Sequence, residues 1–205
     1  RLYHYTGTDA EHFQRFVLFT NYQRYVNEFV AFGKAQMRDG GDYDMFVQPG
    51  NVIIPNAKQS DKTASGTLPA HLPQMPAYHL TRPDRLGITM VNIGVGPSNA
   101  KTITDHLAVL RPHCWLMIGH CGGLLPSPKL GDYALAHAHI PENPVLGQDL
   151  PLWVPVPPIA EIQVALQEAV ARITGLRGQD LKTRMRTGTV ATTANRNWEL
   201  RYAEL

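Results

Sequence analysis

The sequence has little cysteine, no long hydrophobic run and no large excess of either charge. Cys114 and Cys121 lie in one apolar stretch, and a disulfide framework or zinc site needs more ligands, so reduced, buried thiols are predicted. No apolar run reaches the roughly 18 residues of a membrane span, which predicts a soluble protein. The 19 Lys and Arg against 17 Asp and Glu are too balanced to hold nucleic acid by charge.

The chain has enough apolar residues to build a hydrophobic core. Hydrophobic residues make up 43% of its 205 positions, which suits one ordinary domain or part of a larger one. The first five residues contain no apolar signal-peptide core, so the cytoplasm is the expected location. Because the chain starts without Met and ends at Leu205 without turn chemistry, we expect both ends to be cut.

The hydrophobic pattern predicts alternating strands and helices. Continuous apolar runs predict buried strands, and apolar residues at helical spacing predict helices between them. Pro83 and Asp84 mark the turn of a predicted hairpin. The strands are expected over 16–19, 52–54, 77–80, 88–93, 115–118, 133–136 and 185–190, and the helices over 22–38, 100–110 and 159–173. Residues 40–76 are expected to form an irregular insertion, because Ser, Thr, Lys, Pro and Gln dominate from 55 onward. This pattern is typical of an α/β sheet covered on both faces.

Glycine-rich turns after two of the buried strands are the strongest functional signal. Gly94 and Gly96 let the backbone approach a ligand, and Ser98 is expected to cap the following helix. The second turn, 119–123, contains three glycines around His120 and Cys121. A tight turn without a ligand and a purely structural histidine remain open alternatives. The spacing fits neither a Walker loop nor a dinucleotide-binding fingerprint, so nucleoside triphosphate and NAD binding are not supported.

Several longer motifs resemble the nucleoside phosphorylase and nucleosidase superfamily, and within it the bacterial AMP nucleosidase family. The glycine turns extend to VNIGVGPSNAKT and WLMIGHCGGL, followed by GDY. The resemblance continues in RLYHYTGT near the start, in VLFTNY, and in RTGTV with NWEL near the end. It covers most of the chain except for about 40–76.

The resemblance implies a phosphorylase/hydrolase-like, three-layer α/β/α fold with a mixed central sheet. It also implies hydrolysis of the N-glycosidic bond of AMP to adenine and ribose 5-phosphate, without metal or organic cofactor. The alternatives are a purine nucleoside phosphorylase, another adenine nucleosidase, or a non-catalytic nucleotide-binding fragment. Residues 1–15 would join a missing N-terminal domain, and 16–205 would be an incomplete catalytic domain.

The resemblance also places the binding residues, in three groups along the chain. Those near the phosphate or attacking water are Thr20, Asn21 and Tyr22. Those near the sugar and its phosphate are Gly94, Gly96, Pro97, Ser98, His120, Cys121, Gly122 and Gly123. Those near the purine are Thr192, Thr193 and Trp198, where stacking of Trp198 on adenine and a plain core role are both open. The candidates for binding the 5′-phosphate are Arg24, Lys101 and Arg196.

Three differences from the family and its relatives bear on the mechanism. The ribose-binding Glu and the purine-side Asp of the family are expected beyond Leu205, so the catalytic residues are not named, with His120 as the one candidate. Met117 stands where phosphorolytic relatives carry an Arg, which favours water as the nucleophile. No carboxylate occurs at 20–22 to activate that water.

The resemblance further implies a homo-oligomer, a trimer or hexamer, in which His4 reaches across a subunit boundary. Phosphate and ATP are the effectors that it suggests. No nucleic acid or membrane partner is expected.

Overall fold

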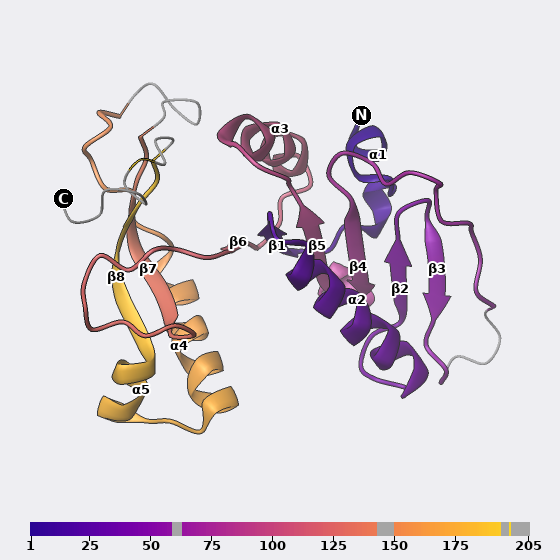
Figure 1. The fold of residues 1–205 in the computed structure, drawn as a ribbon. Helices are drawn as coiled ribbons and strands as arrows, with labels where there is room; N and C mark the ends of the chain where they lie inside the picture. Colours follow the sequence, from indigo (N-terminus) through magenta and orange to yellow (C-terminus); the bar gives the residue numbers. More distant parts are fainter. Residues whose placement is uncertain (59–62, 143–149, 194–196, 198–205) are drawn as a thin grey trace. The chain divides into compact units, whose positions relative to one another are not determined.

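The computed structural model describes residues 1–58, 63–142, 150–193 and 197. The chain forms two compact units, Arg1–Gly119 and His120–Leu205 (Figure 1). None of the helices in the described ranges is long and apolar enough to cross a membrane. Each unit has its own sheet and its own core.

The first unit is built on a six-stranded mixed sheet with the order β3-β2-β4-β5-β1-β6. β1 pairs in parallel with β5 and β6, whereas the β2–β3, β2–β4 and β4–β5 pairs are antiparallel. This confirms the mixed α/β sheet and the predicted hairpin of β4 and β5. The strands are β1 (Phe16–Thr20), β2 (Met45–Gln48), β3 (Val52–Pro55), β4 (Ala77–Thr81), β5 (Ile88–Asn92) and β6 (Cys114–Ile118).

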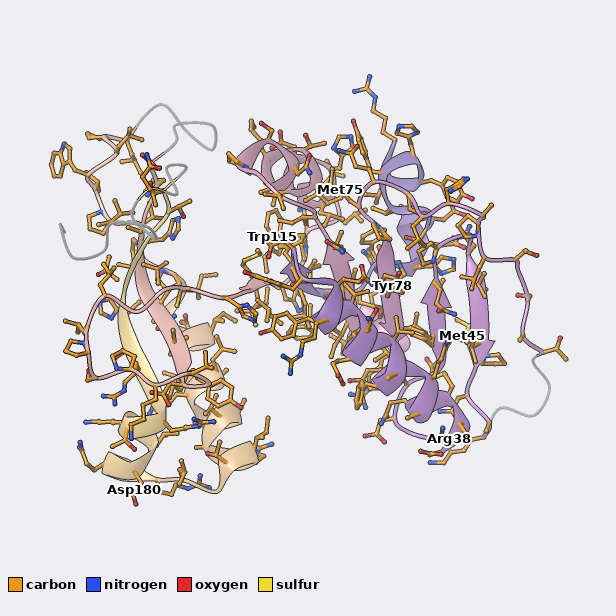
Figure 2. The ribbon with its side chains drawn as sticks, in the orientation of Figure 1. Arg38, Met45, Met75, Tyr78, Trp115 and Asp180 are labelled. Atoms are coloured by element: carbon orange, nitrogen blue, oxygen red, sulfur yellow. The ribbon has the colours of Figure 1, made fainter. Side chains whose placement is uncertain are left out.

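Helices cover both faces of this sheet because its strands are apolar on both sides. Val17 and Phe19 share a core with residues of α3 (Pro97–Ala108), and Leu18 packs on the opposite side with residues of α2 (Gln23–Arg38). Alternate side chains of a strand point to opposite faces, so the two cores lie on the two faces of the sheet. Figure 1 shows α2 running along one face, and its Val26 and Phe29 share a core with Tyr78 of β4, which Figure 2 labels. Helices on both faces of one sheet give the first unit three layers, α/β/α.

Residues 1–15 belong to the first unit, in which α1 (Leu2–Thr6) contacts α3, and Phe13 is buried in the core. A short turn of 3-10 helix, Ala10–His12, links α1 to β1. His4 packs edge-on against Tyr5 of its own chain, with ring centroids 5.2 Å apart. The division of the described chain falls after Gly119.

The segment 40–76, which was expected to be an irregular insertion, contains two strands. β3 confirms the strand predicted over 52–54, but β2 was not predicted and lies inside the sheet, between β3 and β4. Phe46 and Val47 are fully buried there. Four residues are too few to show a periodicity, and only the pairing with β4 makes them a strand. Among the described residues of this segment, irregular structure lies outside the two strands.

The second unit contains a two-stranded parallel sheet and two helices. β7 (Tyr133–Ile140) pairs with β8 (Met185–Ala191), and α4 (Ala160–Thr174) and α5 (Gly178–Arg184) follow between them in the chain. β7 is longer than the predicted 133–136, α4 agrees with the predicted helix to within one residue, and α5 was not predicted. A small core joins Leu135 to Ala171 of α4, Leu181 of α5 and Met185.

Candidate functional site

In the first unit, three parallel strands deliver their following loops to one edge of the sheet. Thr20 of β1 is level with Asn92 of β5 on one side and with Ile118 of β6 on the other. The loops that begin at Asn21, Ile93 and Gly119 therefore leave the sheet side by side. Ligands of open α/β sheets bind at this carboxyl edge. Two of the three sequence-predicted groups thus begin here, Thr20–Tyr22 and Gly94–Ser98.

The loop after β1 is held by the buried hydroxyl of Thr20. That oxygen accepts a hydrogen bond from the backbone N–H of Tyr22 at 3.1 Å, and the Thr20 carbonyl accepts one from the N–H of Ile93 at 2.8 Å. The Tyr22 ring lies near Gly119, since a Cβ there would be 3.7 Å from Tyr22 Cε2. Asn21 differs from both neighbours. Its Oδ1 is buried and has no hydrogen-bond partner among the described residues.

The loop after β5 presents bare backbone. Gly94 and Gly96 have φ values of 64° and 106°, which favour glycine because a Cβ is strained in this region. A Cβ on Gly96 would meet no atom within 4 Å, so the backbone conformation, and not crowding, requires glycine there. α3 begins directly afterwards, so its first free N–H groups face out of this loop. The expectation that Ser98 caps α3 is wrong, because Gly96 is the N-cap and no side chain bonds there.

Asn92 and Gln23 are two residues of this edge that sequence reasoning missed. Asn92 Oδ1 accepts a hydrogen bond from the N–H of Gly94 at 3.1 Å, and its Nδ2 donates to Gln23 Oε1 at 3.2 Å. Asn92 therefore ties the glycine loop to the first residue of α2. The available signal was a polar residue at the end of an otherwise apolar strand.

The structure describes two of the three cationic candidates for binding the 5′-phosphate. Lys101 Nζ lies 2.9 Å from Asp105 Oδ2, one turn further along α3, and both side chains are largely exposed. That ion pair reduces the charge that Lys101 offers to a phosphate. Arg24 is exposed on the first turn of α2. Arg196 lies outside the described residues.

The end of β6 and the turn after it are exposed. Met117 is 52% exposed. His120, Cys121, Gly122 and Gly123 are all exposed in the second unit. The predicted buried thiols are therefore corrected for Cys121, whereas Cys114 is partly buried and burial raises its pKa. Neither cysteine forms a disulfide.

In the second unit, the expected purine-side residues follow β8. Thr192 and Thr193 are exposed, and Thr192 Oγ1 lies 3.0 Å from Nε2 of His139 at the carboxyl end of β7. His139 was not among the predicted residues, because nothing in its own segment relates it to a residue 53 positions later. Trp198 lies outside the described residues.

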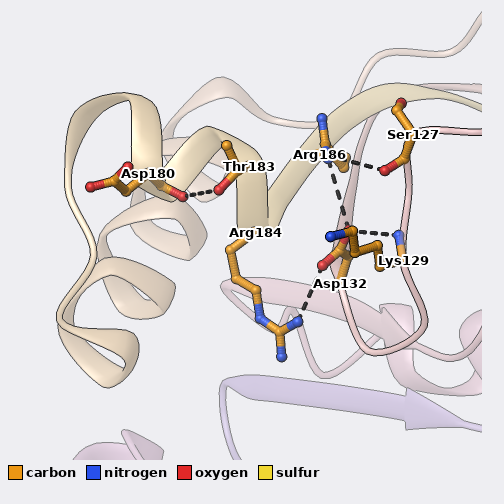
Figure 3. A network of polar contacts seen from close by, with 7 residues as sticks. All are labelled: Ser127, Lys129, Asp132, Asp180, Thr183, Arg184 and Arg186. Atoms are coloured by element: carbon orange, nitrogen blue, oxygen red, sulfur yellow. Dashed lines mark hydrogen bonds and ion pairs between the residues drawn. The ribbon is translucent and has the colours of Figure 1, made fainter.

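An ion-pair network lies at the amino ends of β7 and β8 (Figure 3). Asp132 accepts hydrogen bonds from the backbone N–H of Lys129 at 2.8 Å and from Arg184 Nη1 at 3.2 Å. Arg186 Nε lies 3.9 Å from the same carboxylate. The Lys129 N–H and then Arg184 hold the pKa of Asp132 below its ordinary value. Asp132, Arg184 and Arg186 stand at the amino ends of both strands, so we interpret them as structural.

The described residues contain no group of three or more His, Cys, Asp or Glu side chains that could hold a metal ion. What the edge of the first unit offers is backbone N–H groups, amide side chains and a helix N-terminus. Together with the mixed sheet, these define an α/β protein whose candidate small-molecule site lies at the carboxyl ends of its parallel strands.

Comparison with known proteins places this chain in a family. Residues 78–203 match the model of the phosphorylase superfamily, and the chain belongs to that superfamily. It is 55% identical over 204 residues to proteins of Escherichia coli strains K12 and O157:H7, each named AMP nucleosidase. The match covers 99% of this chain and 42% of each relative, so the chain spans less than half the length of these relatives.

Solved structures agree with the fold. The AMP nucleosidase of Bacteroides thetaiotaomicron has a TM-score of 0.68 at 26% identity, over 99% of this chain and 66% of that one. The purine nucleoside phosphorylase of Toxoplasma gondii, in complex with immucillin-H, has a TM-score of 0.61 at 16% identity, over 95% and 66% of the two chains. The second likeness supports the fold alone.

Proposed function

We propose that the protein containing these residues hydrolyses the N-glycosidic bond of AMP and releases adenine and ribose 5-phosphate. The observation that carries the proposal is the 55% identity to two proteins named AMP nucleosidase, which extends over 99% of this chain. It includes every loop at the carboxyl edge of the first unit. The activity would belong to purine nucleotide salvage or degradation.

The chemistry requires little beyond binding and positioning. The bond between the sugar and adenine breaks through a cation-like sugar, so the protein must favour that state over the substrate. The leaving adenine takes up a proton, and a water molecule must be held on the other face of the sugar. Water is the only co-reactant, and no metal or organic cofactor is needed.

The glycine loop and the start of α3 suit the sugar-phosphate end of AMP. Gly94 and Gly96 leave their backbone open, and the free N–H groups of Ser98 and Asn99 begin a 12-residue helix. The positive end of a helix dipole favours an anion. We assign the 5′-phosphate to this loop, with Arg24 and Arg196 as its cationic partners. Lys101 is the weaker candidate because of its ion pair with Asp105.

The remaining assignments rest on the family resemblance. His120–Gly123 would line the sugar, Thr192, Thr193 and Trp198 would hold the purine, and Thr20–Tyr22 would lie at the attacking water. We also propose assembly into a trimer or hexamer, phosphate and ATP as effectors, and a cytoplasmic location. The two unpaired cysteines are consistent with a reducing compartment.

The test is to incubate the protein, with all of its natural sequence, with AMP in phosphate-free buffer and to separate the products by chromatography. We expect adenine and ribose 5-phosphate in equal amounts, with no requirement for phosphate. Adenosine serves as the matched control, because it lacks only the 5′-phosphate, and should react more slowly. An absolute requirement for phosphate would indicate a phosphorylase, and AMP binding in calorimetry without any adenine would indicate a non-catalytic binder.

A further inference from the structure

The starting observation is the unsatisfied acceptor on Asn21. Its Oδ1 is buried, yet no donor reaches it among the described residues. Leaving a buried acceptor unpaired destabilises a folded protein. Such groups are rare in folded proteins, and each one calls for an explanation such as a functional role. The position of Asn21 supplies one.

Asn21 follows β1 directly, between the two neighbouring parallel strands. The register places Thr20 level with Asn92 and Ile118, so Asn21 stands level with Ile93 and Gly119. It therefore lies in the middle of the carboxyl edge, with the glycine loop on one side. Its neighbours in the loop are otherwise engaged, because the Thr20 hydroxyl binds the N–H of Tyr22 and the Tyr22 ring lies near Gly119.

We infer that Asn21 Oδ1 accepts a hydrogen bond from the water molecule that attacks the sugar of AMP. This inference rests on the proposed hydrolysis. The acceptor is neutral, so it suits an O–H donor and not the anionic phosphate, which itself only accepts hydrogen bonds from the protein. No carboxylate occurs among Thr20, Asn21 and Tyr22, so Asn21 is the residue of this loop with a free acceptor.

The reaction balances without a strong base on the protein. A lone pair of the water forms the new bond to the sugar carbon, and the bonding pair of the C–N bond leaves with adenine. Adenine takes up one proton, and the attacking water gives one up to solvent as the bond forms. A cation-like sugar reacts with neutral water once that water is correctly placed. Asn21 needs only to place the water, which an amide oxygen can do.

The decisive variant is Asn21→Leu, which has nearly the same size and no polar atom. In the protein with all of its natural sequence, we expect kcat for AMP hydrolysis to fall about 10-fold or more, with KM changed less than about twofold. The variant should be at least as stable as the parent, because it removes an unpaired buried acceptor. Gln167→Leu, at an exposed position of α4, makes the same change from an amide to an apolar side chain away from this edge, and as the matched control it should leave both constants unchanged.

Asn21→Asp provides a second, independent test of the proposed role of Asn21. It keeps an acceptor at the same place and adds a basic oxygen, so kcat should be retained or raised, and an acid limb should appear in its pH profile as the carboxylate protonates. A rise in KM for AMP with Asn21→Asp would mean that the amide nitrogen binds the substrate phosphate, and would overturn the inference.

The outcomes separate the two proposals. If the parent protein releases adenine and Asn21→Leu does so equally fast, the water assignment is wrong and the proposed function stands. A rise in KM with unchanged kcat would likewise overturn it, because Asn21 would then bind substrate. If the parent protein releases no adenine from AMP, the proposed function itself fails.

Discussion

His79 gives the sharpest stability prediction, because it is fully buried in the first unit and an ordinary histidine titrates near neutral pH. It sits on β4, where Nδ1 lies 2.9 Å from Thr89 Oγ1 and Nε2 lies 2.9 Å from Thr8 Oγ1. Burial, reinforced by the neighbouring His12, holds the pKa of His79 well below the ordinary 6.5. The imidazole is therefore neutral in the folded protein.

The hydrogen bonds around His79 also favour one neutral form. Thr89 Oγ1 accepts the backbone N–H of Gln14 at 2.8 Å, so its own hydrogen is free for His79 Nδ1. Nε2 then carries the ring proton and donates it to Thr8 Oγ1, which lies 3.2 Å from Thr6 Oγ1. A second ring proton would leave the Thr89 hydrogen without its acceptor. Protonation thus disrupts the hydrogen bond between His79 of β4 and Thr89 of β5.

The sign and size of the pH effect follow from this. In the unfolded chain His79 takes up a proton as the pH falls through 6.5, but in the folded protein it does not, so acid favours unfolding. A histidine that stays neutral when folded loses about 1.3 kcal/mol of stability between pH 7 and pH 5.5. We expect that loss in urea unfolding of the parent protein, measured by circular dichroism at the two pH values.

His79→Gln isolates this contribution. The variant should be less stable at pH 7 by about 1–3 kcal/mol, since it disturbs a buried hydrogen-bonded site. Its stability should then fall less than that of the parent on acidification, by the same approximate 1.3 kcal/mol. If the two proteins lose stability in parallel between these pH values, His79 is not the titrating group and the reasoning is refuted.

Two further predictions concern packing and charge. Gly33→Ala should destabilise the protein by about 1–2 kcal/mol in urea unfolding, because its Cβ would lie 2.6 Å from the buried Phe46 ring; Gly188→Ala, with open space around it, should not. Asp132→Asn should lower stability at pH 7 because Arg184 loses its ionic partner. The pKa of Asp132 is lowered, so this difference should shrink as the pH falls through 3.8 and below, and a constant difference would contradict the ion-pair role.

Much of the fold could be predicted because the signals are local. β1, the β4–β5 hairpin, α2 and α4 each carry their own periodicity, and their bounds agree with the structure to within a few residues. β2 and α5 could not be predicted in this way. β2 has four residues, and α5 has seven with only Leu181 buried, so each depends on the neighbours that cover it.

The candidate site, too, could be predicted only where its signal is local in the sequence. The glycine loop at Gly94 and Gly96 was visible as a motif, because positive φ angles leave a glycine signature in the sequence. The role of Asn92, which bonds both Gly94 and Gln23, was not. A single Asn at the end of a strand has many uses, and only its partners show which one applies.

The sequence by itself determined the family, the alternation of strands and helices, and the glycine turns, because each of these is written in residues that are close together in the chain. The tertiary structure decided that Phe13, Leu2 and Tyr5 pack in the core of the first unit, and that Asn21 Oδ1 is buried without a hydrogen-bond partner among the described residues. Both depend on contacts between segments far apart in sequence, where burial and hydrogen bonding are settled only once the sheet has formed.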